Sequence, residues 1–166
     1  MSFGMLDARL QAFWCWVGVF PWDFDREAAA AVGEIAPAAA RKALGELLKH
    51  CMIDYDEETK RYRLHDLSRV YAVSRLGEAE RYGAELRHAR YFKGLLDSAD
   101  ALYMKGGASM AGGLALFDRE WANIEAGQAW AASRAASDEA AAGLCSDYPD
   151  AGTFYLALPW GVSVGL

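Results

Sequence analysis

The stretch of sequence that decides the fold is residues 62–72, which read Tyr62-Arg63-Leu64-His65-Asp66-Leu67-Ser68-Arg69-Val70-Tyr71-Ala72. Tyr62 and Leu64 alternate with arginines, which predicts a short strand with one face in water. An amphipathic helix is predicted to follow, so His65 and Asp66 lie where a strand ends and a helix begins. Because a helix start has free backbone N–H groups and partial positive charge, this junction is a candidate site for an anion such as a phosphate.

The patterns on both sides of this junction predict a mainly α fold. We expect helices at residues 7–20, 26–35, 38–51 and 67–76, with a hairpin at 52–64. Asp25 is the expected N-cap of the second helix, and Pro37 is expected in the first turn of the third. The order helix, helix, helix, hairpin, helix is a winged-helix arrangement. The hairpin is its wing, and the third helix has the position that winged-helix transcription factors use for DNA.

Helical spacing also predicts which side chains are buried. In the third helix the predicted inward residues are Ala39, Ala43, Leu47 or Leu48, and Cys51. In the helix after the hairpin they are Leu67, Val70 or Tyr71, and Ser74. His50 and His88 are expected at the surface or at helix ends.

From residue 78 onward the whole pattern is helical. We expect helices at 80–103, 114–132 and 138–145 and a turn at 148–152. The predicted apolar stripe of the second of these is Leu114, Phe117, Trp121, Ile124 and Gln128. We therefore expect a winged-helix domain at 5–77, a TPR-like helical bundle at 78–152 and an uncharged apolar tail at 153–166. This tail buries itself, meets a partner or is a shortened element.

Composition and charge restrict the possible functions. The net charge of −6 over 166 residues does not favour a broad nucleic-acid surface, which draws on clustered Lys and Arg. The three cysteines, Cys15, Cys51 and Cys145, are far apart, so we expect no metal site, no disulfide and a cytoplasmic location. No signal peptide or bilayer-spanning run is visible, so no membrane association is expected.

A set of short stretches carries a further pattern, at residues 18–21, 24–25, 44–48, 55–67, 87–92, 118–124 and 129–131. In this order they resemble the end of the nucleotide-binding module in signal-transduction (STAND) ATPases of the NB-ARC and AP-ATPase type. The form that they resemble most is the bacterial kind followed by tetratricopeptide repeats. The resemblance covers about residues 5–150. Leu64-His65-Asp66 stands at the position of that family's Met-His-Asp motif, with Leu in place of Met.

The resemblance implies a nucleotide-sensing role for His65 and Asp66 in an intact parent ATPase that binds ADP or ATP. His65 would contact the β-phosphate of ADP and hold the closed, inactive state, and Asp66 would cap the following helix. The implied partners are the upstream nucleotide-binding domain and other proteins, the latter through the helical region. The sequence contains no Gly-x-x-x-x-Gly-Lys-Ser/Thr run. This chain alone is therefore expected to be no enzyme and to hold no cofactor, with the phosphate-binding core lying upstream.

A DNA-binding winged-helix transcriptional regulator is the alternative function. Its DNA-facing residues would be Arg41, Lys42, Lys49, Lys60 and Arg61, with His50 beside them on the third helix. Glu46 interrupts that helix, and the wing carries four acidic residues between 54 and 58. Because acidic neighbours oppose phosphate binding, we place the regulatory role first and DNA binding second.

Overall fold

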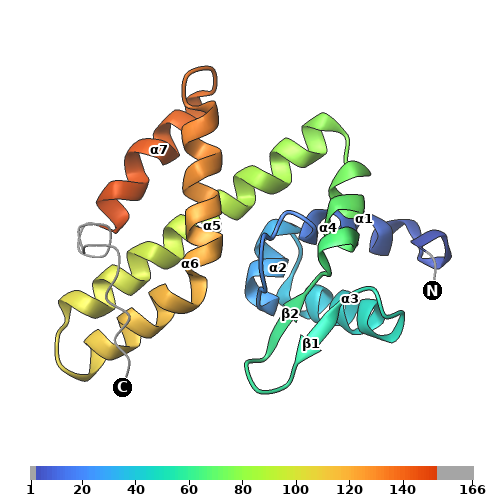
Figure 1. Cartoon of the computed structure of the whole chain (residues 1–166), viewed down its shortest axis with the longest axis horizontal. Helices are drawn as coiled ribbons and strands as arrows, with labels where there is room; N and C mark the ends of the chain where they lie inside the picture. Colours follow the sequence, from blue (N-terminus) through green and yellow to red (C-terminus); the bar gives the residue numbers. More distant parts are fainter. Residues whose placement is uncertain (1–2, 153–166) are drawn as a thin grey trace. The chain divides into compact units, whose positions relative to one another are not determined.

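The computed structural model describes residues 3–152, which form a mainly helical fold with one small antiparallel sheet (Figure 1). The described elements are a 3-10 turn, η1 (Phe3–Met5), then α1 (Ala8–Val17), α2 (Arg26–Val32), α3 (Pro37–Lys49), β1 (Asp54–Asp56), β2 (Arg61–Arg63), α4 (Asp66–Ser74), α5 (Glu78–Met104), α6 (Ala108–Arg134) and α7 (Glu139–Ala151). The predicted order of helices and hairpin is confirmed.

Two compact units divide the chain, Met1–Tyr91 and Phe92–Leu166, and the division lies within α5. The first unit holds α1 to α4, the hairpin and the start of α5. The second holds the rest of α5 with α6 and α7. The expected domains at 5–77 and 78–152 stay a prediction, and the apolar tail at 153–166 lies outside the described residues.

Local signals fix the starts of the first three helices. Asp7 Oδ1 accepts the N–H of Leu10 at 2.9 Å, and Asp25 Oδ1 accepts the N–H of Ala28 at 2.8 Å. Each cap satisfies a backbone donor that the helix leaves unpaired, which stabilises the helix by about 1 kcal/mol. Pro37 is the first residue of α3, where its missing N–H costs nothing. The predictions for Asp25 and Pro37 are therefore confirmed.

The hairpin is bound to the helices at two points. β1 and β2 pair antiparallel with Tyr55 opposite Tyr62. Phe24, which lies between α1 and α2, adds a third extended segment by exchanging two backbone hydrogen bonds with Tyr62, at 2.9 and 2.8 Å. Just before β1, the carbonyl of Met52 accepts a hydrogen bond from Nε1 of Trp14 on α1 at 3.0 Å. These contacts hold the end of β2, and hence the start of α4, against the helical core.

The predicted inward face of α3 is wrong in part. The buried side chains of α3 are Ala40, Leu44 and Leu47, whereas Ala39 and Cys51 are exposed. The helix is rotated from the predicted position because Leu44 and Leu47, its larger apolar residues, occupy the core together. Alanines at helical spacing could not decide this orientation, because a buried alanine gains little over an exposed one.

The predicted inward face of α4 is also wrong. Ala72 is fully buried, while the predicted residues are exposed: Leu67 by 86%, Val70 by 62% and Tyr71 by 46%, together with Ser74. The reason is steric. A Cβ added at Gly18 would lie only 2.8 Å from the Cβ of Ala72, so the end of α1 and α4 meet through their smallest residues. A bulky side chain does not fit at this contact.

In the second unit α6 packs against α7. Asp138 caps α7 by accepting the N–H groups of Ala140 and Ala141 at 2.9 and 3.2 Å. The buried residues of α6 are Gly113, Glu120, Asn123, Ile124, Gly127 and Ala131. Ile124 of the predicted stripe is fully buried, and its other four residues are half-buried, so that prediction holds in part. The remaining buried residues of α6 are small or polar.

Three helices are longer than predicted, among them α6, which spans Ala108–Arg134 where the sequence predicts a helix at 114–132. The predicted helix at 80–103 spans Glu78–Met104, and its Phe92 and Leu96 are fully buried. The predicted turn at 148–152 is wrong, because α7 continues to Ala151 with Pro149 inside it. Pro149 lacks one backbone donor, but the fully buried ring of Tyr148 beside it anchors this last part of the helix.

Candidate functional site

The strand-to-helix junction is the first candidate site. β2 ends at Arg63 and α4 begins at Asp66, which makes His65 the residue just before the helix. The imidazole Nε2 of His65 lies 3.0 Å from Oδ2 of Asp54 on β1, and the two side chains are 78% and 61% exposed. A polar contact between two side chains this exposed contributes at most about 1 kcal/mol. An anionic ligand could therefore take the place of Asp54 at little energetic cost.

The role expected for Asp66 as a helix cap is wrong. Asp66 is itself the first residue of α4, and His65 holds the cap position without a side-chain cap bond. The imidazole of His65 is engaged with Asp54 instead. The carboxylate of Asp66 still favours the helix through the positive end of its dipole, but it adds negative charge where an anion would bind.

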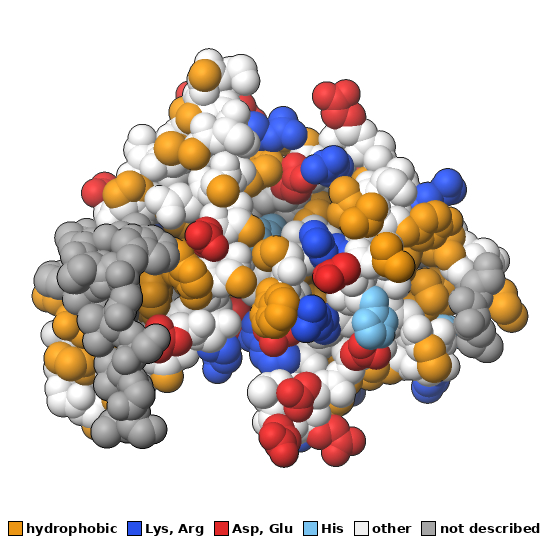
Figure 2. Space-filling model, in the orientation of Figure 1, with side chains coloured by type: hydrophobic (Ala, Val, Ile, Leu, Met, Phe, Trp, Pro, Cys, Tyr) orange, Lys and Arg blue, Asp and Glu red, His pale blue; other side chains and the backbone are white. Residues whose placement is uncertain are grey.

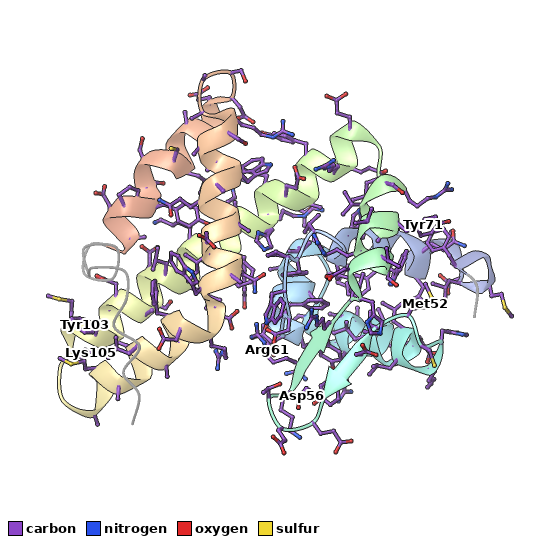
Figure 3. All side chains as sticks on the ribbon, viewed as in Figure 1. Met52, Asp56, Arg61, Tyr71, Tyr103 and Lys105 are labelled. Atoms are coloured by element: carbon purple, nitrogen blue, oxygen red, sulfur yellow. The ribbon has the colours of Figure 1, made fainter. Side chains whose placement is uncertain are left out.

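An apolar surface lies next to this junction. Leu67, Val70 and Tyr71 form what we call the α4 face, and the ring of Tyr71 meets the ring of Phe3 edge-on with centroids 5.7 Å apart. Figure 3 labels Tyr71 on α4, and Figure 2 shows hydrophobic side chains gathered over the region of α1 and α4. Exposed apolar groups in one place are typical of a surface that contacts another molecule.

Arg61 is not available to DNA, which corrects its assignment as a DNA-facing residue. Its side chain is only 4% exposed, and its Nε donates to Oδ1 of Asp23 at 2.8 Å. Its Nη2 donates to the carbonyl of Asp23 at 3.0 Å, and its Nη1 lies 3.9 Å from Oδ2 of Asp25. Arg61 therefore joins β2 to the segment before α2 and serves the fold (Figure 3).

The other candidate DNA contacts on α3 are all exposed, but one of them forms an ion pair with an acidic side chain. Arg41 and Lys42 are exposed. Lys49 is also exposed, but its Nζ lies 2.8 Å from Oε1 of Glu46, one turn earlier. This pair neutralises part of the basic charge that the DNA hypothesis needs.

At the tip of the hairpin, Lys60 is exposed and faces local acidic charge. Asp56 accepts the backbone N–H groups of Glu58 and Thr59 at 2.8 and 3.3 Å. These hydrogen bonds hold the pKa of Asp56 below its ordinary value, so its carboxylate stays ionised. The wing therefore presents mixed charge rather than a basic surface.

A pocket that the sequence analysis missed lies in the first unit, between the end of α1, α4 and the start of α5. It has a volume of about 340 Å³ and is lined by Gly18, Val19, Arg69, Val70, Val73, Ser74, Arg81 and Glu85. We call it the Arg69 pocket. No local pattern could have revealed it, because it exists only where α1 and α4 meet through Gly18 and Ala72.

His88 is 4% exposed, with its ring edge against Phe20 at 5.2 Å between centroids, so its assignment to the surface is wrong. Among residues 3–152, no group of three or more His, Cys, Asp or Glu side chains is placed to hold a metal ion. Within the same range, no helix combines the length and the apolar character needed to cross a membrane.

Comparison of the chain with models of known protein families, with curated proteins and with solved structures found no match. The candidate function therefore depends on the residues and their geometry.

Proposed function

We propose that this chain is the regulatory winged-helix and helical module of an NB-ARC-like STAND ATPase, which senses the nucleotide state of the parent protein and mediates protein–protein contacts. The observation that carries this proposal is the exposed junction at His65, with the apolar α4 face beside it. An imidazole at a helix start suits a phosphate. The adjoining apolar residues suit a protein domain that would present that phosphate.

The arrangement of the first unit supports the winged-helix part of the proposal. Phe24 lies between the first two helices and pairs with β2, so one extended segment joins the hairpin in a small sheet. α2 and α3 then precede the hairpin, and α4 follows it. In this assignment the hairpin is the wing. The pair α6 and α7, which pack on each other, would belong to the repeat-like region.

The weak pairing of His65 suits a switch. In the closed parent protein, His65 would exchange Asp54 for the β-phosphate of ADP. The parent's nucleotide-binding domain would cover Leu67, Val70 and Tyr71. ATP in place of ADP would favour the open form by binding the open form more tightly than the closed one, because a ligand shifts an equilibrium only by its differential affinity for the two states.

DNA binding remains the second function, and the structure gives less support for it. Of its five proposed contacts, Arg61 is buried in an ion pair and Lys49 is paired with Glu46. Arg41, Lys42 and Lys60 remain, and they stand on a chain with a net charge of −6.

A titration with duplex DNA separates the two functions. Fluorescence anisotropy of a labelled duplex, measured at low salt with the whole chain, should show no tight binding. Tight binding that weakens steeply with salt, and that is lost in the double variant Arg41→Gln/Lys42→Gln, would establish the DNA-binding role instead.

The nucleotide-sensing role is tested in the parent ATPase. We expect His65→Leu to speed ADP release and to favour the active form, because the imidazole contact with the β-phosphate is lost. His50→Leu makes the same chemical change at the end of α3 and should leave ADP release unchanged. Equal ADP release from the parent and from its His65→Leu variant would remove His65 from the site.

A further inference from the structure

The Arg69 pocket contains an arginine whose hydrogen bonding is incomplete. The Nε of Arg69 is buried and has no hydrogen-bond partner in the part of the chain that the structure describes. Two other arginines of the first unit have acidic partners: Arg61 pairs with Asp23, and Arg81 pairs with Glu85. A buried N–H group in a folded protein nearly always has an acceptor, and residues 3–152 provide none for this one.

We propose that the Arg69 pocket binds a small monocarboxylate with a short aliphatic body, and that Arg69 is its principal donor. The planar guanidinium matches the two oxygens of a carboxylate, which can accept two parallel hydrogen bonds from it. His65 is not among the lining residues, and Val70 is the one residue that the pocket shares with the α4 face, so the proposed carboxylate contact at Arg69 is distinct from the proposed phosphate contact at His65.

The charge of the pocket selects a monoanion. Its ionisable lining residues are Arg69, Arg81 and Glu85. The Nε of Arg81 lies 2.7 Å from Oε1 of Glu85, so these two charges compensate each other. One positive charge remains, on Arg69. A phosphate dianion would bring a second negative charge near Glu85, which Coulomb repulsion disfavours.

The shape and lining of the pocket select the body of the ligand. Val19, Val70 and Val73 provide its apolar surface. Its volume of about 340 Å³ is near the lower end of the range for small-molecule sites. A short alkyl chain can pack against these three valines. The carboxylate could come from a free acid or from the C-terminus of another protein.

The test observes Arg69 directly in the whole wild-type chain. Two-dimensional ¹H–¹⁵N spectra of the arginine Nε–H groups are recorded during titration with sodium butyrate, with its neutral analogue butyramide, and with inorganic phosphate at the same pH and ionic strength. We expect butyrate to shift the Arg69 signal in a saturable way with a millimolar Kd. Butyramide should not shift it, and phosphate should act more weakly. The signal is assigned by its loss in Arg69→Lys.

Two variants test whether the binding depends on Arg69. Arg69→Gln should weaken butyrate binding at least about tenfold, since it removes a charge-assisted hydrogen bond. Arg9→Gln removes an equal charge from an exposed position of α1 and should bind butyrate as the wild type does. The wild-type spectra decide the question even if Arg69→Gln fails to fold.

Three results would overturn the proposal. The first is an Arg69 signal that butyrate does not move across the millimolar range. The second is an equal response to butyramide, and the third is a stronger response to phosphate. A peptide that ends in an unblocked aliphatic residue, compared with the same peptide amidated, then distinguishes the two sources. Tighter binding of the acid peptide than of butyrate indicates a protein carboxylate, and weaker binding indicates a free acid.

Discussion

Arg61 of β2 and Asp23, which lies just before α2, form an ion pair that the fold largely encloses. The Nε of Arg61 donates to Oδ1 of Asp23 at 2.8 Å, and the guanidinium is 4% exposed while the carboxylate is 29% exposed. A second donation, from Nη2 to the backbone carbonyl of Asp23 at 3.0 Å, fixes the same segment. Because Phe24 follows Asp23 and pairs with Tyr62, the ion pair and the sheet reinforce each other.

Removing the acid of this pair should destabilise the fold strongly. In Asp23→Ala the buried guanidinium of Arg61 loses its main counter-charge, and breaking a buried pair in this way costs about 3–5 kcal/mol. We expect the lower end of that range, since Asp23 is partly exposed. Urea unfolding followed by circular dichroism measures the loss. Lys42→Gln, an exposed change on α3, should alter stability by less than about 0.5 kcal/mol. A small loss in Asp23→Ala would show that solvent replaces the carboxylate.

Replacing Gly18 and Gly45 by alanine should change the free energy of unfolding in opposite directions. A Cβ at Gly18 would lie 2.8 Å from the Cβ of Ala72 and 3.0 Å from the carbonyl oxygen of Cys15, which is backbone and cannot move aside easily. Gly18→Ala should therefore cost about 1–3 kcal/mol. Gly45, inside α3, has nothing within 4 Å of the added Cβ. Gly45→Ala should gain about 0.5–1 kcal/mol from helix propensity.

The same unfolding measurement compares the two variants. A neutral Gly18→Ala would mean that α1 and α4 can separate slightly without loss, and it would weaken the steric explanation for the exposed α4 face. A destabilising Gly45→Ala would mean that α3 packs more closely than its open surroundings indicate.

Local patterns in the sequence predict local structure well in this chain. Asp25 and Pro37 mark helix starts because their effect needs only the next few backbone groups. The hairpin follows from alternation on both sides of residues 57–60, and the long helix from its regular spacing. The proposed anion site at His65 also begins as a local signal, a polar pair at a strand-to-helix junction.

Properties that depend on distant residues could not be predicted in the same way. The inward face of α4 is set by Gly18, which lies more than fifty residues earlier in the sequence. The contact at Gly18 leaves room only for a side chain as small as that of Ala72. The alternation in the hairpin predicts that Arg61 is a surface residue. It is buried because the fold places Asp23, which is distant in the sequence, beside it. The Arg69 pocket needs α1, α4 and α5 together. Each case depends on which side chain lies opposite, and helical or strand spacing alone does not carry that information.

The cysteines of the first unit should differ in reactivity. Burial raises the pKa of the Cys15 thiol, and its residue is 4% exposed, whereas Cys51 is exposed. Because the thiolate is the reactive form, iodoacetamide at pH 8 should modify Cys15 at least about tenfold more slowly than Cys51. Mass spectrometry of peptides from timed samples measures both rates. In urea the two rates should converge, and comparable rates in the folded chain would contradict the burial of Cys15.

The last prediction concerns the stability of the second unit at alkaline pH. Tyr148 is fully buried, and burial raises the pKa of its phenol well above its ordinary value of about 10. The unfolded chain therefore loses this proton at a lower pH than the folded chain. The contribution of Tyr148 is complete below pH of about 10 and is lost as the pH rises above that value toward the folded pKa, by about 1.4 kcal/mol per pH unit. Tyr148→Phe keeps the ring and removes the proton, so its urea-unfolding free energy should fall less steeply than that of the wild type above pH of about 10. Parallel slopes for the two proteins would mean that the phenol ionises as easily in the folded chain as in the unfolded one, which a buried Tyr148 does not allow.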